Sequence, residues 1–123
     1  ERCWENLHRT KQAEAHVPSI WPLEVVNVLL VAERRDRIQA RESVRFLDIL
    51  GRLPIRVEPE AVERRMRDLL QLARDCGLSS YDASYLDLAM RRGLPLATAD
   101  RGLTRAAKEY RVPLLSSSGE GHP

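Results

Sequence analysis

Three acidic residues, Glu24, Asp82 and Asp100, have surroundings in which carboxylates could do chemistry. Glu24 and Asn27 are the only hydrophilic residues in the stretch over 20–32, IWPLEVVNVLLVA. These two residues are three apart in a predicted helix, so they lie on the same face. A helix that is apolar on nearly every side is expected to be buried on nearly every side. A carboxylate buried there needs a cation or several hydrogen bonds. The pattern also allows the two residues to face the one solvated stripe, or Glu24 to pair with an arginine.

Asp82 and Asp100 each have a structural explanation when taken alone. Ser79 followed three residues later by Asp82 fits a capping box, and Asp100 between an apolar strand and a helix fits an N-cap. The helix between the acids has about twelve residues and descends about 18 Å. The strand after it has about five residues and climbs back about 17 Å. We therefore expect both acids at the carboxyl edge of this strand. Thr98, two residues before Asp100, would orient Asp100 or a water molecule there; the alternative is that Thr98 is an ordinary strand residue.

Glu24 also lies just past a predicted strand, so the three acids are expected to converge on the edge at which sites form in α/β sheets. Carboxylates gathered there repel one another unless a cation sits among them, and all-oxygen sites favour hard divalent cations such as Mg²⁺ or Mn²⁺. Other residue types give weaker evidence for a functional site. The histidines lack metal-ligand spacing, and Cys3 and Cys76 have no partner motif. No glycine-rich phosphate loop or nucleophilic-serine elbow is present.

The elements that must position these acids alternate along the chain. Hydrophobic periodicity and turn residues predict strands over 15–18, 55–58, 94–99 and 112–115, and helices over 3–15, 19–35, 39–50, 59–76, 80–92 and 100–111. Short apolar strands separated by helices indicate an α/β fold with a parallel sheet covered by helices.

Length and composition restrict the class of protein. The 123 residues are enough for one domain over 1–115, followed by a tail over 116–123 that is expected to be disordered. Hydrophobic residues make up 43% and charged residues 31%, which argues against disorder in the rest. The net charge of +2 argues against a protein that holds nucleic acid by charge alone. With no apolar span, no signal sequence and two cysteines, the chain is expected to be cytoplasmic and off the membrane.

The segments VPSIWPLEVVNVLLVAERR and LSSYDASYLDLAMRRGLPLATADRGLTRAAKEYRVPLL resemble the PIN-domain ribonucleases. Within that family they are most similar to the VapC-like toxins of bacterial toxin–antitoxin pairs. The resemblance covers most of 17–115 and implies a metal-dependent endoribonuclease on a five-stranded parallel sheet. Three of the family's four clustered acids match this sequence: the helix motif of Glu with Asn three later falls on Glu24, the YDA motif on Asp82, and the T-x-D motif on Asp100.

The resemblance implies roles and partners as well. Glu24, Asp82 and Asp100 would hold Mg²⁺ or Mn²⁺ and act as the catalytic acids, with Asn27 and Thr98 in support. The substrate would be RNA, such as transfer or ribosomal RNA. The partners would be a cognate antitoxin protein and a second copy in a homodimer. Helices over 3–15 and 39–50 are candidate walls of the antitoxin groove, or ordinary core or dimer faces.

One departure from the family pattern concerns its first strand, which is central in the sheet and ends in the first acid. No such segment is recognisable here, so we expect an N-terminally incomplete PIN-like domain whose remaining strands fall into two unlinked pairs. The competing hypothesis is a catalytically impaired PIN-like scaffold that binds a partner protein or RNA without cutting. A nucleotide-binding or receiver-like α/β domain is a third alternative, but it needs a phosphate loop or a lysine after a strand, and neither is visible.

Overall fold

The structure, a computed structural model, describes residues 8–9, 14–59 and 62–115. A small sheet has the strand order β1-β2-β3. The strands are β1 (His8–Arg9), β2 (Ala15–Val17) and β3 (Ile55–Val57). β2 and β3 run parallel with His16 opposite Arg56, whereas β1 runs antiparallel to β2. All three residues of β2 are buried, so this strand lies at the centre of the sheet and of its packing.

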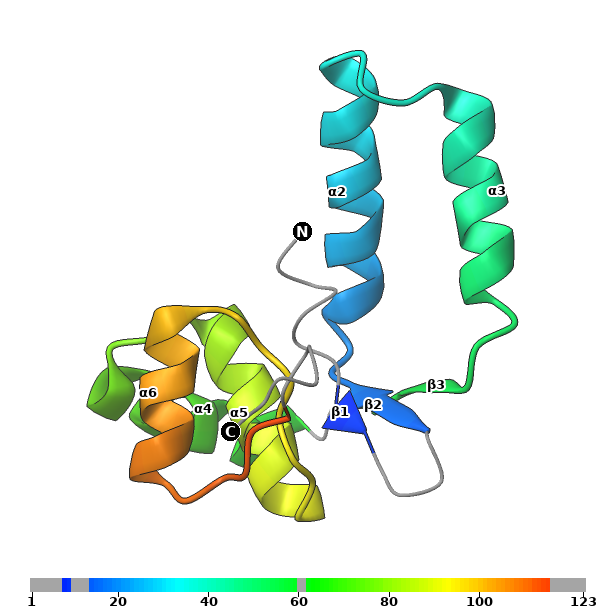
Figure 1. Cartoon of the computed structure of the whole chain (residues 1–123). Coiled ribbons are helices and arrows are strands. Elements are labelled where there is room, and N and C mark those ends of the chain that lie inside the picture. The colour runs from blue at the N-terminus through cyan, green and yellow to red at the C-terminus, as the bar shows by residue number, and fades with distance from the viewer. Residues whose placement is uncertain (1–7, 10–13, 60–61, 116–123) are drawn as a thin grey trace, which may run out of the picture.

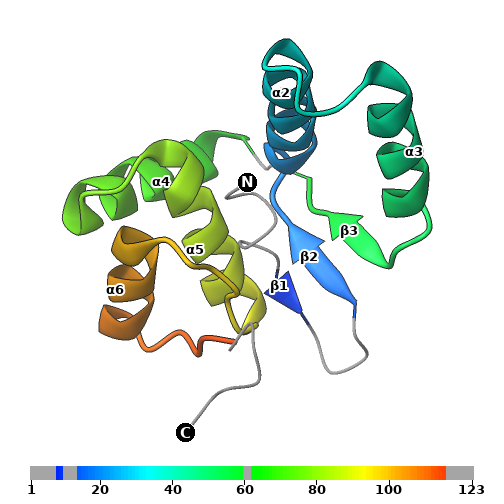
Figure 2. The same ribbon diagram turned by 45° about the horizontal axis from the view of Figure 1, so that its top comes forward.

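Helices surround the sheet in two groups. They are α2 (Trp21–Arg34), α3 (Ala40–Leu50), α4 (Val62–Cys76), α5 (Ser80–Arg92) and α6 (Arg101–Glu109). α2 and α3 form a hairpin that projects from the sheet, while α4, α5 and α6 gather beside it (Figure 1). In the turned view, α5 lies next to the strands, and α4 and α6 lie on the far side of α5 from the strands (Figure 2). None of these helices is long and apolar enough to cross a membrane.

The core is built around α5, in which every residue from Asp82 to Ala89 is buried. Tyr85, Leu86 and Leu88 are fully enclosed, and α4 and α6 pack against this helix on two sides. Val17 of β2 and Leu103 of α6 join the same apolar cluster. The predicted α/β fold, with parallel strands flanked by helices, is therefore confirmed.

Local hydrogen bonds and one glycine define the helix ends, and the cap at Ser79 is one that the sequence predicts. Ser79 Oγ accepts a hydrogen bond of 3.1 Å from the backbone N–H of Asp82 at the start of α5. Gly93 ends the same helix with a φ of 64°, in the left-handed region that glycine adopts at least cost. α3 begins with the N–H of Gln39 donating to Glu42 at 2.7 Å. These contacts satisfy backbone groups that a helix leaves without internal partners.

The last two predicted strands are reduced to one bridge. Leu96 and Leu114 pair in parallel, and the N–H of Leu115 donates to the carbonyl of Leu96 at 2.9 Å. Among the described residues, no strand joins this bridge to the sheet. The expectation of two unlinked pairs is met only in part, because β1 adds an antiparallel strand to the pair formed by β2 and β3. The five-stranded parallel sheet that the family resemblance implied is not what the described residues form.

The predicted helix over 3–15 is wrong where the structure describes it. Residues 8–9 form β1 and Ala15 begins β2, while the rest of that segment, apart from residue 14, lies outside the described residues. A strand edge offers a row of backbone donors and acceptors, and pairing with β2 outweighs the helical spacing of a few apolar residues.

The expectation that residues 20–32 are buried on nearly every side is also wrong. Within α2 only Trp21 and Val25 are buried, and Leu23 is 67% exposed. The physical reason is the position of the hairpin: α2 touches the core through its first turns, and the rest of it projects beside α3 (Figure 1). An apolar sequence indicates a preference for burial, but the described chain leaves part of this surface uncovered.

Candidate acidic site

Glu24 lies in the first turn of α2 and makes a hydrogen bond to a distant helix. The hydroxyl of Tyr85, in the middle of α5, donates to Glu24 Oε1 at 2.5 Å. Glu24 is half-buried and Tyr85 is fully buried, so this charge-assisted bond forms largely away from water. Its effect is to bring the start of α2 against one face of α5.

Asp82 lies on that face of α5. It stands three residues before Tyr85, so the two side chains are one turn apart on the same side of the helix. Asp82 is only 7% exposed. The Tyr85–Glu24 bond therefore turns the part of α5 that carries Asp82 toward the helix that carries Glu24.

Asp100 caps α6, as its position between a strand and a helix predicts. Its Oδ2 accepts from the N–H of Leu103 at 2.9 Å, and its own N–H donates to Thr98 Oγ1 at 3.0 Å. The Cβ position that Gly102 leaves empty is 3.5 Å from Asp100 Oδ2 and 3.5 Å from Leu78 Cδ2. Leu78 immediately precedes the cap of α5, so the first turns of α5 and α6 lie next to each other.

Asn27 is placed on the surface of α2. It is exposed and borders a hollow of about 360 Å³. The other walls of this hollow are Val28, Val31, Ala32, Arg35 and Arg37. Thr98 Oγ1 accepts from the backbone N–H of Asp100, and Asn27 stands one helical turn after Glu24 on α2.

The three acids provide the right donor chemistry for a hard divalent cation, because all are carboxylates. Their arrangement is a different matter. Within 14–59 and 65–115, no three His, Cys, Asp or Glu side chains lie close enough to hold a metal ion together. Glu24 Oε1 and Asp100 Oδ2 are instead held by Tyr85 and by the backbone of α6. The structure thus brings the acid-bearing helices together without closing a ligand cluster.

Comparison with protein-family profiles matches residues 2–109 to the PIN domain. The chain belongs to the PIN domain family. No curated protein matches it at a significant level. PIN domains are generally nucleases that depend on divalent metal ions, so this PIN domain has a nuclease-like fold.

A buried polar cluster in this PIN domain escaped prediction from the sequence. Glu58, just after β3, is 4% exposed and its Oε2 accepts from His16 Nδ1 at 2.7 Å. Its Oε1 accepts from Arg92 Nη2 at 2.5 Å. Burial raises the pKa of Glu58, but the hydrogen bonds from His16 and Arg92 outweigh burial, so this pKa lies below its ordinary value of 4.5. The cluster fastens the end of α5 to β2 and β3.

Asp87 is a second acid whose role the structure defines. It is buried on α5, where Arg65 Nη2 lies 3.1 Å from its Oδ1 and Arg91 Nε lies 2.8 Å from its Oδ2. Both carboxylate oxygens are thus occupied by arginines, which makes Asp87 part of the packing between α4 and α5. Asp87 stands five residues after Asp82, more than one helical turn along α5.

A sequence signal for Glu58 existed. It directly follows a short strand, in the same kind of position as Asp100, where side chains gather at the carboxyl edge of parallel strands. His16 gave no comparable signal, because its partner is 42 residues away. Tyr85 likewise has its carboxylate partner 61 residues away in the chain.

Proposed function

We propose that this PIN domain is a metal-dependent endoribonuclease and the toxin of a toxin–antitoxin pair. It hydrolyses RNA phosphodiester bonds with Glu24, Asp82 and Asp100 as its metal-binding and catalytic acids, and with Mg²⁺ or Mn²⁺ as its ion. The main support is the hydrogen bond from Tyr85 to Glu24, because it brings the acid-bearing faces of α2 and α5 together.

The chain's own residues would orient the acids. Tyr85 fixes one oxygen of Glu24, while Thr98 and the N–H of Leu103 fix Asp100 at the start of α6. A divalent ion at such carboxylates would supply a bound water of lowered pKa and offset charge that develops on the phosphorus oxygens. Positioned acids of this kind lose less freedom when an ion and a substrate bind.

The test is cleavage of a panel of transfer RNAs and a ribosomal RNA fragment. The chain is assayed with Mn²⁺, with Mg²⁺, with a chelator, and as Asp82→Asn. We expect cutting that needs the ion and that Asp82→Asn abolishes. Asp48→Asn, which changes an exposed acid on α3, is the matched control and should cut like the unchanged protein. Cutting that persists in chelator, or in Asp82→Asn, contradicts the proposal.

A scaffold that binds RNA or protein without cutting is the second candidate. It is favoured by one observation, the lack of a three-ligand cluster among the described side chains. The two candidates separate in the same assay: a scaffold binds RNA equally with and without an ion and gives no product with either metal. Circular dichroism and thermal melting of each preparation show that a failure to cut is not a failure to fold.

We propose that the antitoxin docks in the groove between α2 and α3. Ser43 of α3 donates to Glu33 of α2, and apolar side chains line the space between the two helices. One part, of about 260 Å³, lies between Val26 and Leu30 of α2 and Val44 and Leu47 of α3. A second part, of about 280 Å³, continues from Leu47 toward the sheet. An amphipathic helix could fill such a groove with an apolar face.

We also propose that the protein forms a homodimer. Exposed apolar side chains also lie outside the groove lining, at Leu23 on α2 and at Ile49 on α3. A second copy could cover part of this surface, since contiguous exposed apolar area marks interaction sites. Mass measurement of the protein alone and with an antitoxin distinguishes the homodimer from the toxin–antitoxin complex.

A further inference from the structure

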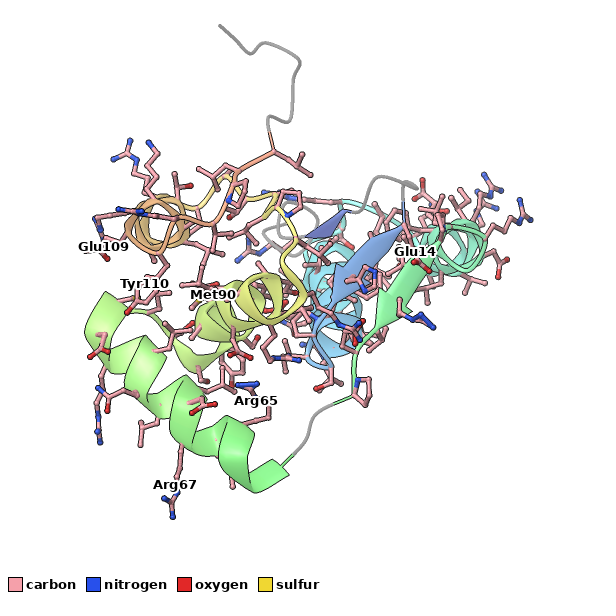
Figure 3. The ribbon with its side chains drawn as sticks, turned by 90° about the horizontal axis from the view of Figure 1, so that it is seen from below. Glu14, Arg65, Arg67, Met90, Glu109 and Tyr110 are labelled. Carbon is pink, nitrogen blue, oxygen red and sulfur yellow. The ribbon has the colours of Figure 1, made fainter. Side chains whose placement is uncertain are left out.

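The outer side of α6 carries a row of cations. Arg101, Arg105 and Lys108 stand four and three residues apart, which places them on one side of the helix. Leu103, Ala106 and Ala107 are buried on the opposite side. In Figure 3, nitrogen-tipped side chains project from α6 away from α4. This face is therefore solvent-exposed and strongly basic, although the chain as a whole has a net charge of only +2.

The row borders an open hollow on the surface of the molecule. Its volume is about 580 Å³, and it is lined by Ala99, Arg101, Thr104, Arg105, Lys108 and Glu109. Three cations thus face one carboxylate, that of Glu109. Among the residues that the structure describes, this lining contains no aromatic side chain and no large aliphatic one. Protein interfaces usually have an apolar or aromatic centre, so this composition suits an anionic chain better than a folded partner.

These cations differ from those that serve the fold. Arg65, Arg91 and Arg92 are all bound to buried carboxylates within the molecule. In contrast, none of the three cations on α6 forms an ion pair with a described residue. Their positive charge remains available to a ligand from solution.

The cationic face begins beside a predicted catalytic acid. The Cβ position that Gly102 leaves empty lies 3.5 Å from Asp100 Oδ2 and 3.9 Å from Arg105 Nη2. The guanidinium of Arg105 therefore reaches back toward the first turn of α6, where Asp100 caps the helix. A phosphate held by Arg105 would lie near that turn.

We propose that this face of α6 is a subsite for the phosphate backbone of single-stranded RNA, running from Asp100 along the helix. Arg101 and Arg105 are separated by about 6 Å along the axis, and Lys108 by a further 4.5 Å or so. Such a row can contact successive phosphates, and arginine binds phosphate oxygens as a planar fork. Without an aromatic platform for bases, the contact is to the backbone and independent of sequence. The choice of RNA rests on the proposed function, but binding here requires neither an ion nor cleavage.

The experiment measures binding without cutting. A fluorescent single-stranded oligouridylate is titrated in chelator at several salt concentrations, and the slope of log affinity against log salt is determined. We compare Arg101→Ala/Arg105→Ala/Lys108→Ala with a control, Arg52→Ala/Arg67→Ala/Arg74→Ala, that removes the same charge from exposed positions elsewhere. Figure 3 shows Arg67 pointing away from the molecule on the outer side of α4.

The α6 variant is expected to reduce the steepness of this slope by about 2, since each phosphate contact to a single strand contributes about 0.7. The control should leave the slope unchanged. Equal effects of both variants, or of neither, overturn the proposal. The proposal is also overturned if a polyglutamate peptide binds as tightly as the RNA and its binding is lost in the same variant. The face would then serve acidic proteins.

The outcomes remain separable from those of the proposed function. If the α6 variant has a less steep salt dependence of binding, and the unchanged protein never cuts RNA, the subsite is supported and the proposed nuclease activity is contradicted. Ion-dependent cutting with an unchanged slope does the reverse. Arg105→Lys, which keeps the charge, controls for folding and should retain most of the salt dependence. Circular dichroism and thermal melting are recorded for every variant.

Discussion

At the scale of single residues, Tyr85 has a role that its sequence neighbourhood does not reveal. Its hydroxyl holds Glu24 from 61 residues away and is fully enclosed. Tyr85→Phe should lower the free energy of unfolding by about 1.5–3 kcal/mol, the range for hydrogen bonds to charged groups. Chemical denaturation measures this change. Tyr81→Phe is the control, since that tyrosine is 54% exposed on the same helix and should change stability little. Equal losses in both variants would contradict the role assigned to Tyr85.

Glu58 makes stability depend on pH. Its pKa lies below the ordinary value of 4.5, because hydrogen bonds from His16 and Arg92 outweigh the effect of burial. A depressed carboxyl pKa contributes stability above 4.5 that is lost as the pH falls through the folded-state value. Glu58→Gln should therefore cost about 1–3 kcal/mol at pH 7, and the difference from the unchanged protein should shrink in acid.

Denaturant midpoints measured from pH 7 down to pH 3 check this expectation. Asp48→Asn is again the control, because Asp48 is exposed on α3. A constant difference between Glu58→Gln and the unchanged protein over the whole pH range would show that the Glu58 carboxylate contributes no pH-dependent stability.

At the scale of elements, two glycines in different backbone settings should respond in opposite ways to alanine. Gly93 ends α5 with a φ of 64°, where a side chain is strained, so Gly93→Ala should destabilise by about 1 kcal/mol or more. Gly102 lies inside α6, where an added Cβ would make ordinary contacts at 3.5 Å. Gly102→Ala should therefore stabilise by about 0.4–1 kcal/mol. Melting temperatures of the two variants check this, and a shift of the same sign in both would contradict it.

The elements themselves were largely predictable, because local signals determine them. Ser79 and Asp100 cap the two helices that the sequence assigned to them, and Gly93 ends α5. The exposure of α2 could not be predicted, since an apolar pattern records a preference and not the neighbour that satisfies it. The helix over 3–15 failed for a related reason: β2 offers β1 a pairing edge that no local pattern encodes.

The acidic site was predictable in part, because local patterns point to the acids but not to their distant partners. Local patterns identified Glu24, Asp82 and Asp100, and their assignment as metal ligands remains a prediction. The contacts made by Tyr85 and Glu58 depend on partners that are 61 and 34 or more residues away, so only a three-dimensional arrangement could reveal them. Sequence patterns thus located candidate acids, while the structure determined which side chains hold them.

At the scale of the whole molecule, the groove between α2 and α3 should control association. Leu47, 42% exposed, lines both parts of the groove. Leu47→Asp should abolish binding of a helical partner while leaving the melting temperature nearly unchanged. Leu70→Asp is the matched control, because Leu70 is similarly exposed but lies on α4, outside the groove lining. Light scattering and titration with an antitoxin measure the result, and equal loss of binding in both variants would place the partner elsewhere.

The separation of the Leu96–Leu114 bridge from the sheet has a consequence for how the protein opens. Among the described residues, no backbone ladder runs from the sheet to the bridge between Leu96 and Leu114. The projecting hairpin is tied to α5 mainly through its first turns and the bond from Tyr85 to Glu24. Partial openings that release only the hairpin should therefore cost less free energy than global unfolding. In native-state hydrogen exchange, the amides of α3 should lose protection well before those of α5, which exchange only when the entire molecule unfolds.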